Sequence, residues 1–266
     1  MSGASACVIA RDAEATLDRC LASLAWCDEC IVVVDPRSRD ATHARARAAG
    51  ARVILHPYAG NVEQKRFALS QAKGEWVVAL DADEALSPEL ASRLRAFLRD
   101  PDPGCDGVEM NRIAHHLGRW IRHGDFHPDW QLRAFRRERG RVLGRNPHGR
   151  VRVPGRVVRL AGDLEHRSYA SLADQIERVQ GFSRIEAEEM LAAGRRARLH
   201  HLVLRPPARF LRGYLLRQGF RDGVPGLVIA SVTAFHVFLK YAKLWELQAR
   251  EARAQRGGAE RSAGPR

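Results

Sequence analysis

Apolar runs of strand length alternate with segments of helical periodicity along the first 80 residues. In the segments between the runs, apolar residues recur every three or four positions, as in the helix predicted to follow Asp12. The predicted strands cover residues 5–10, 30–34, 52–56 and 76–80. This alternation predicts an α/β fold, with a doubly wound, mainly parallel sheet and flanking helices. Ligands bind such sheets at the carboxyl ends of the strands.

The pattern changes beyond residue 84. Residues 87–89, Ser-Pro-Glu, favour a helix start, because a capping side chain, an early proline and an acid stabilise a helix amino terminus. Later strands are predicted at 107–113 and 131–137. Residues 151–160 alternate apolar and basic positions around Pro154 and Gly155, which predicts a β-hairpin.

Helical periodicity dominates from residue 171 onward, and the final residues are polar and rich in glycine and arginine. Such a composition predicts a disordered tail. The expected organisation is a sheet-containing domain, a helical carboxyl-terminal region and the tail, over residues 1–165, 166–249 and 250–266.

Acidic side chains follow two of the predicted strands. Asp35 comes after the second strand, and Asp81-Ala82-Asp83 follows the fourth. Residues i and i+2 of an extended chain point the same way, so Asp81 and Asp83 can face one site. Carboxylate oxygens suit Mg²⁺ or Mn²⁺ carrying a diphosphate. Taken alone, such acids are equally typical of a loop that begins after a strand.

The chain of 266 residues has a formal net charge of +13 and a pI near 10.5. This charge indicates an anionic partner and leaves nucleic acid, a membrane surface and a phosphorylated substrate open, beside a merely solvated basic surface. No signal peptide is evident, and five cysteines, an odd number, suit a reducing compartment. We therefore expect a cytoplasmic protein. Cys27 and Cys30 have C-x-x-C spacing without a second pair, which favours buried structural thiols.

The order of these motifs resembles the family 2 glycosyltransferases of GT-A fold, which pair an early acidic residue with a metal-binding D-x-D. The matching segments are Cys7–Glu14, Ile31–Asp35, Ser38–Thr42, Gln64–Leu69 and Trp76–Glu84. Later segments resemble one subgroup, the lipopolysaccharide core β-1,4-glucosyltransferase-like proteins. These segments are Leu117–Gly124, Pro128–Arg133, Gly219–Gly223 and Lys240–Glu246.

The resemblance implies an inverting, metal-dependent transfer of a hexose, glucose from UDP-glucose, to a lipopolysaccharide-core or similar anionic glycolipid. Mg²⁺ or Mn²⁺ would be held by Asp83, with Asp81 contacting the ribose or a metal-bound water. The metal would stabilise the leaving diphosphate electrostatically. By the same resemblance, the nucleotide sugar would contact Ala10, Arg11, Glu14, Asp35, Lys65, Asp81 and Ala82.

Inverting transfer requires a base for the acceptor hydroxyl. Asp129 is the first candidate, because the resemblance places its segment beside the acceptor cleft, and Asp125 is the second. Related enzymes often carry His-Glu where this chain has His148-Gly149, which leaves an altered or inactive enzyme open. Guanidinium groups suit a phosphate or carboxylate on the acceptor. The candidate acceptor contacts are Arg119, Arg122, Arg133 and His148.

Residues 227–239 are uncharged and apolar, but shorter than the roughly 20 residues of a spanning helix. Cations lie on both sides of this run, at Arg205, Arg209, Arg212, Arg217, Arg221, Lys240 and Lys243. The pattern predicts a helix lying peripherally on the cytoplasmic face of the inner membrane, with packing against the catalytic domain as the alternative.

Two other functions fit the charge or the sheet less well. A nucleic-acid-binding protein would interleave its basic residues with stacking aromatics, which this chain does not, so no nucleic-acid partner is expected. A sugar nucleotidyltransferase would carry a glycine-rich loop after its first strand, where this chain has residues 10–13, Ala-Arg-Asp-Ala.

Overall fold

A computed structural model describes residues 3–144, 149–167, 169 and 171–262. The chain divides into two compact units. Unit 1 comprises Met1–His115 and Pro128–Ser168, and unit 2 comprises His116–His127 and Tyr169–Arg266. The segment His116–His127, expected within the first domain, thus groups with the carboxyl-terminal helices.

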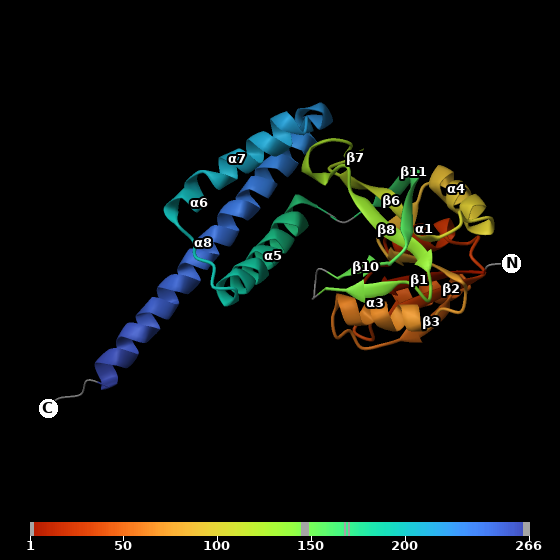
Figure 1. Ribbon diagram of the computed structural model, residues 1–266, viewed down its shortest axis with the longest axis horizontal. Helices are drawn as coiled ribbons and strands as arrows, with labels where there is room; N and C mark the ends of the chain where they lie inside the picture. Colours follow the sequence, from red (N-terminus) through yellow and green to blue (C-terminus); the bar gives the residue numbers. More distant parts are fainter. Residues whose placement is uncertain (1–2, 145–148, 168, 170, 263–266) are drawn as a thin grey trace. The chain divides into compact units, whose positions relative to one another are not determined.

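The sheet of unit 1 is mixed, with strand order β3-β2-β1-β4-β8-β6-β11-β5. Its strands are β1 (Ala4–Ala10), β2 (Glu29–Val34), β3 (Arg52–Leu55), β4 (Trp76–Asp81), β5 (Glu84–Leu86), β6 (Cys105–His116), β8 (Trp130–Arg136) and β11 (Arg156–His166). The first four strands are parallel, as their βα alternation predicts, whereas β8 runs antiparallel to β4 and β5 antiparallel to β11. The architecture is the α/β GT-A arrangement that was expected (Figure 1).

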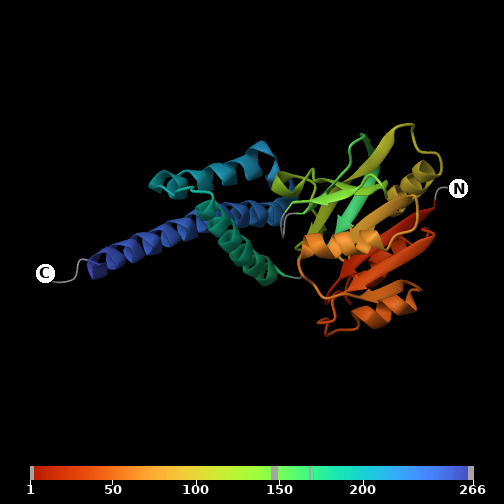
Figure 2. The same cartoon turned by 60° about the horizontal axis from the view of Figure 1, so that its bottom comes forward.

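Helices cover both faces of this sheet (Figures 1 and 2). One face carries α1 (Leu17–Ser23), α2 (Thr42–Ala48) and α4 (Pro88–Arg99). The other carries α3 (Asn61–Ser70) and the ribbon of β9 (Arg141–Leu143) and β10 (Arg150–Arg152). The predicted start of α4 is confirmed, since the Ser87 hydroxyl accepts the backbone N–H of Leu90 at 3.2 Å.

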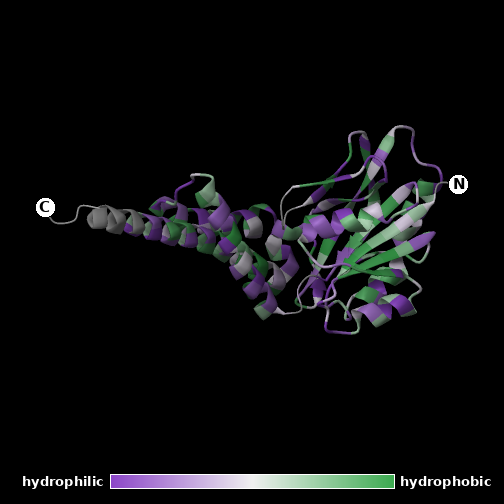
Figure 3. Ribbon diagram, turned by 90° about the horizontal axis from the view of Figure 1, so that it is seen from below, coloured by the Kyte–Doolittle hydropathy of each residue, from purple (hydrophilic) through white to green (hydrophobic). Residues whose placement is uncertain are grey.

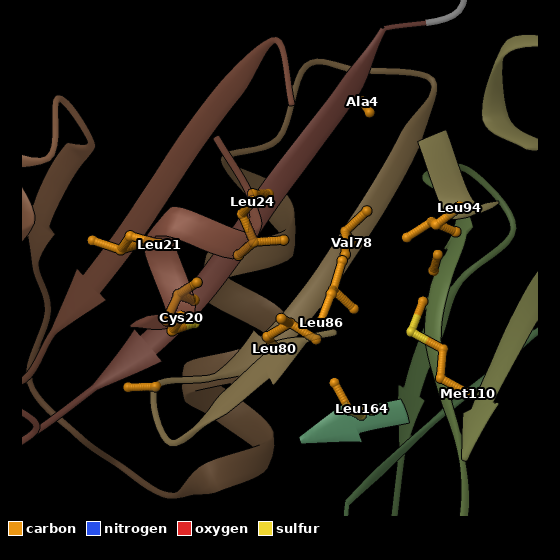
Figure 4. Close-up of a cluster of buried hydrophobic side chains, with 14 of the residues drawn as sticks. Ala4, Cys20, Leu21, Leu24, Val78, Leu80, Leu86, Leu94, Met110 and Leu164 are labelled. Carbon is orange, nitrogen blue, oxygen red and sulfur yellow. The ribbon is translucent and has the colours of Figure 1, made fainter. Parts of the chain in front are cut away.

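The main core lies between the sheet and α1 and α4. Leu24 directly after α1, Val78 and Leu80 of β4, Leu94 of α4 and Met110 of β6 are buried together (Figure 4). The central strands are predominantly hydrophobic (Figure 3). Burying each such side chain contributes roughly 1.5–3 kcal/mol, so this core holds the strand ends in place.

The hairpin predicted over residues 151–160 does not form. Instead, β10 pairs with β9, and β11 joins the main sheet beside β6 and β5. Asp106 of β6 explains the difference, because its carboxylate accepts the backbone N–H of Gly155 at 2.9 Å. A Cβ at Gly155 would collide with that carboxylate. The turn is therefore anchored to β6, which directs β11 into the sheet.

The Cys27 and Cys30 side chains are free thiols and partly buried. Burial raises the pKa of the Cys30 thiol to about 11. Burial likewise raises the pKa of Cys27. Both thiols therefore stay protonated at neutral pH, which is consistent with the structural role predicted for them.

Unit 2 is helical. Its elements are the short strand β7 (Arg119–Trp120), the 3-10 turns η1 (Gly124–Phe126) and η3 (Gly219–Asp222), the π-helical turn η2 (Arg212–Leu216), and the helices α5 (Leu172–Ala192), α6 (Leu199–Val203), α7 (Arg205–Leu211) and α8 (Gly223–Ser262). A small core joins them around Ala187, Ala197, Tyr241 and Leu244.

Helix α8 extends through most of the segment that was expected to be disordered. That prediction is wrong for the backbone up to Ser262. Residues 246–256 consist mainly of alanine, arginine, glutamine and glutamate, which are strong helix formers. The i,i+4 ion pair of Glu246 with Arg250, at 2.6 Å, adds a small contribution.

Candidate active site

The carboxyl ends of β1, β2 and β4 bring the predicted donor-binding residues to one edge of the sheet. The strand register places Ala10 beside Val34, and Ile9 beside Asp81. Asp35 follows Val34 directly, and its backbone N–H donates to the Ala10 carbonyl at 3.1 Å. These strand ends therefore lie side by side at one edge of the sheet.

Asp35 is a buried carboxylate held by arginine. The Arg37 guanidinium donates to both Asp35 oxygens at 2.9–3.1 Å, and Arg11 lies 3.6 Å from Oδ2. The hydrogen bonds from Arg37 lower the pKa of Asp35. The strand end thus presents an ionised acceptor of hydrogen bonds, as recognition of a base or ribose requires.

Glu14 ties two loops of this edge together. Its Oε2 accepts the backbone N–H of Ala41 at 3.0 Å, and its own N–H donates to Asp40 at 2.9 Å. Asp12, at φ 47°, accepts the backbone N–H of Arg39 at 2.8 Å. Glu14, predicted to contact the nucleotide, thus also positions the loops that border the nucleotide edge.

Asp81 lies between two cations. Lys65 Nζ is 2.8 Å from Asp81 Oδ1, and Arg133 donates to Oδ2 at 3.0 Å. Burial alone would raise the pKa of Asp81, but the charges of Lys65 and Arg133 outweigh it and hold that pKa well below its usual value. Asp81 is thus ionised and already charge-paired, whereas Asp83 has a different environment.

Asp83 faces a histidine from a distant strand. The Nε2 atom of His166 lies 3.2 Å from Asp83 Oδ2, and the Asp83 side chain is 33% exposed. His166 reaches this position because β11 pairs antiparallel with β5, which places His166 opposite Glu84. A carboxylate and an imidazole therefore meet at the edge where the diphosphate is expected.

This pair fits a divalent ion. A carboxylate oxygen suits Mg²⁺ or Mn²⁺, and the imidazole nitrogen 3.2 Å away would be the second protein ligand. Within the described residues, no cluster of three or more His, Cys, Asp or Glu side chains could hold a metal. Asp83 and His166 would thus leave the remaining positions to phosphate and water, as is common for Mg²⁺.

Glu84 connects the donor edge to the candidate base. Its carboxylate is fully buried and lies 2.5 Å from the Arg133 guanidinium and 3.1 Å from that of Arg112. Burial opposes the charge of Arg133, but the carboxylates of Glu84 and Asp81 overcome this effect and raise its pKa. Arg112 in turn binds Asp129 at 2.7 Å. A continuous chain of alternating charges therefore links Asp81 to Asp129.

Asp129 precedes β8, whose amino end lies at the carboxyl end of β4. One carboxylate oxygen accepts from Arg112, and the other accepts from the side chain of Gln131 at 2.5 Å. Asp129 is thus held on the same sheet edge as the two donor-side carboxylates. Asp125 belongs to unit 2, where its buried side chain lies 3.4 Å from both Arg209 and Arg217.

The predicted acceptor residues are divided between the two units. Arg119 donates to the backbone carbonyl of Asp222 at 3.1 Å, and Arg122 donates its backbone N–H to the Asp222 carboxylate at 3.0 Å, both within unit 2. Arg133 lies in unit 1, bonded to Asp81 and Glu84. His148 lies outside the described residues.

The family model described as Glycosyl transferase family 2 matches residues 5–154, more than half of the chain. This chain belongs to glycosyl transferase family 2. The lipopolysaccharide core biosynthesis glycosyltransferase LpsC of Rhizobium meliloti (strain 1021) is 32% identical over 94% of both chains. An uncharacterized glycosyltransferase of Rickettsia typhi is 27% identical, over 93% of this chain and 88% of that protein.

Among solved structures, this glycosyltransferase resembles glucosyl-3-phosphoglycerate synthase from Mycobacterium tuberculosis in complex with Mg²⁺ and uridine diphosphate. The two chains are 19% identical with a TM-score of 0.47, and the match covers 73% of this chain and 80% of that one. Another structure of that enzyme contains Mn²⁺.

Three site residues of this family 2 glycosyltransferase were not singled out from the sequence. Arg112 and His166 lie on strands that pair with strands distant in the chain. In the sequence, Glu84 is a third acidic residue directly after Asp83, and nothing local distinguishes it. The basic alternation over 151–160 gave no sign that His166 would come to face Asp83. The signal that identifies each is a tertiary contact rather than a motif.

Proposed function

We propose that this glycosyltransferase transfers a hexose, with UDP-glucose as the first candidate donor, to an anionic glycolipid of the lipopolysaccharide core. Inversion at the anomeric carbon and dependence on Mg²⁺ or Mn²⁺ are part of the proposal. The observation that carries it is the convergence of Asp35, Asp81 and the Asp83–His166 pair at one sheet edge. The similarity to LpsC over nearly the whole chain supports the acceptor class.

Each residue then has a chemical task. Asp35 accepts hydrogen bonds from the nucleoside. Asp83 and His166 would hold the metal, which would supply electrostatic stabilisation for the negative charge that develops on the diphosphate. Asp129 takes the proton of the acceptor hydroxyl as its oxygen forms a bond to the anomeric carbon and the nucleoside diphosphate leaves. Arg112 and Gln131 orient the Asp129 carboxylate.

The proposal predicts metal-dependent release of nucleoside diphosphate. The purified full chain should release UDP from UDP-glucose when Mg²⁺ or Mn²⁺ is present, faster with a lipopolysaccharide-core acceptor, and EDTA should stop the reaction. The measurement is a coupled assay across a panel of nucleotide sugars with and without each metal. If another nucleotide sugar is turned over instead, that sugar is the donor in place of UDP-glucose. If no donor is turned over, the proposed glycosyl transfer is refuted.

Unit 2 carries features that support peripheral attachment to the inner membrane. Residues 195–221 contain eight arginines and no acidic residue. In the same stretch Leu199, Leu204 and Leu216 are 76%, 62% and 79% exposed. Apolar side chains interspersed with arginines are typical of segments that lie in an anionic headgroup layer. Binding to anionic lipids would account for the positive charge of this segment without a nucleic-acid partner.

Helix α8 extends this apolar character. The run 227–239 is too short to span a membrane, but the helical segment Gly219–Arg253 is long and apolar enough by length and composition, and 22% of its most apolar stretch is buried. We propose that this segment lies at the membrane surface together with residues 195–221, on the cytoplasmic face.

Vesicle binding tests this attachment. The protein should sediment with vesicles containing phosphatidylglycerol and much less with phosphatidylcholine vesicles, and added salt should weaken binding. Leu216→Asp should reduce binding at least about tenfold, since it removes an apolar side chain and adds a repelled charge. The matched control is Leu55→Asp, an exposed leucine of unit 1. Equal binding of the two variants would contradict the assigned surface.

A further inference from the structure

Unit 1 contains a cavity of about 190 Å³ beside the donor edge. This volume is far above the roughly 10–15 Å³ that one water needs. The lining residues that matter are Lys65, Trp130, Gln131, Arg133, Arg150 and Arg152. They come from α3, from the start of β8 and from β10.

The cavity borders both halves of the proposed reaction. Gln131 donates to the candidate base Asp129, and Lys65 and Arg133 both bind the donor-side carboxylate of Asp81. A molecule in the cavity thus touches residues that hold the base on one side and residues that hold the donor edge on the other. An acceptor must occupy such a position, because its hydroxyl reacts between base and donor.

The cavity also carries unbalanced positive charge. The charges of Lys65 and Arg133 are matched by Asp81 and Glu84, and the acid in the lining, Glu109, is paired with Arg159 at 3.0 Å. Arg150 and Arg152 differ, because they are exposed and make no ion pair with any residue in the described ranges.

Arg150 and Arg152 are also suitably placed to bind one group together. They are two positions apart on β10 and therefore share a face of the strand. Two guanidinium groups in this arrangement suit a phosphate or a carboxylate. Trp130 adds a planar aromatic wall, of the kind that lines sites for small organic ligands.

We propose that this cavity is the acceptor subsite and that it binds a sugar bearing a phosphate or carboxylate, with Arg150 and Arg152 gripping the anion. The proposal rests on the proposed glycosyl transfer, because it assigns the second substrate of that reaction. Two guanidinium groups would also suit the phosphates of the nucleotide-sugar donor. The experiment therefore distinguishes an anionic group on the acceptor from the donor diphosphate.

Binding of glucose 6-phosphate and of glucose to the full chain provides the test, measured by saturation-transfer NMR first without nucleotide and then with saturating UDP and Mg²⁺. Glucose 6-phosphate should bind and glucose should not. The double variant Arg150→Glu/Arg152→Glu should weaken that binding at least about tenfold. A loss of this size corresponds to the contribution of one charge-assisted hydrogen bond to the affinity. The affinity for UDP with Mg²⁺ should stay within about twofold.

A matched control carries the same change in charge on the opposite face of the sheet. Arg95 and Arg99 are exposed on α4, and Arg95→Glu/Arg99→Glu should leave the binding of glucose 6-phosphate unchanged. Circular dichroism should show that both double variants are folded, since all four side chains are exposed.

Three results would overturn the subsite. They are no binding of glucose 6-phosphate, binding that survives Arg150→Glu/Arg152→Glu, and displacement of bound glucose 6-phosphate when UDP and Mg²⁺ are added, which would assign the cations to the donor. The proposed transferase activity is judged separately by release of UDP from UDP-glucose. A protein that turns over donor but fails this binding test retains its function and loses only the subsite.

Discussion

Replacing Asp83 with alanine should lower the rate of nucleoside diphosphate release by roughly 10²- to 10³-fold, the range seen when one electrostatic stabiliser of a developing negative charge is removed. Asp83 is partly exposed and its partner is His166, so the fold should survive. The rate is measured with UDP-glucose and Mn²⁺, and metal affinity is measured by Mn²⁺ electron paramagnetic resonance with UDP present.

Two companion variants make the Asp83 result specific. Asp83→Asn keeps the size of the side chain but removes its charge, and should lose both metal affinity and turnover. Glu89→Ala removes an exposed acid of α4 that pairs only with Arg93 in the described structure, at 2.9 Å, and should be neutral. Full turnover by Asp83→Ala would contradict the assignment of this carboxylate as a metal ligand.

Replacing Glu84 with glutamine should lower the free energy of unfolding by about 3–5 kcal/mol, the cost of removing one partner from a buried ion pair. The Glu84 carboxylate is fully buried between Arg112 and Arg133, so its loss leaves two guanidinium charges poorly compensated. Turnover should fall as well, because Arg112 orients Asp129. Urea denaturation followed by circular dichroism measures the stability.

Glu89→Gln is the matched control for Glu84→Gln. It makes the same chemical change in an exposed i,i+4 pair, which is worth about 0.3–0.5 kcal/mol. Similar losses of stability in the two variants would show that the buried charge network does not stabilise the fold. A stable Glu84→Gln enzyme with unchanged turnover would remove the link between Arg112 and the base.

The donor half of the site was largely predictable from local sequence. The acids Asp35, Asp81 and Asp83 follow apolar runs that form β2 and β4, and a parallel sheet brings the carboxyl ends of its strands to one edge. No long-range information is needed for that step, because βα alternation already determines that the strands run the same way.

The partners of those acids depend on strand pairing that the sequence does not display. His166 faces Asp83 because β11 pairs with β5, and Asp106 holds the turn at Gly155 that leads into β11. A local pattern of alternating apolar and basic residues predicted a hairpin there instead. Strand register is decided by side chains far apart in the chain, which a short sequence window does not contain.

The βα order, the family and the acids at the ends of β2 and β4 follow from local sequence, because strand length, helical period and adjacent residues are local properties. The contact of His166 with Asp83 and the link that Glu84 makes between Arg133 and Arg112 arise only when the chain folds. The tertiary structure also assigned Asp125 to unit 2, where Arg209 and Arg217 are its partners. These are contacts between segments far apart in the chain, set by packing and by the pairing of buried charge.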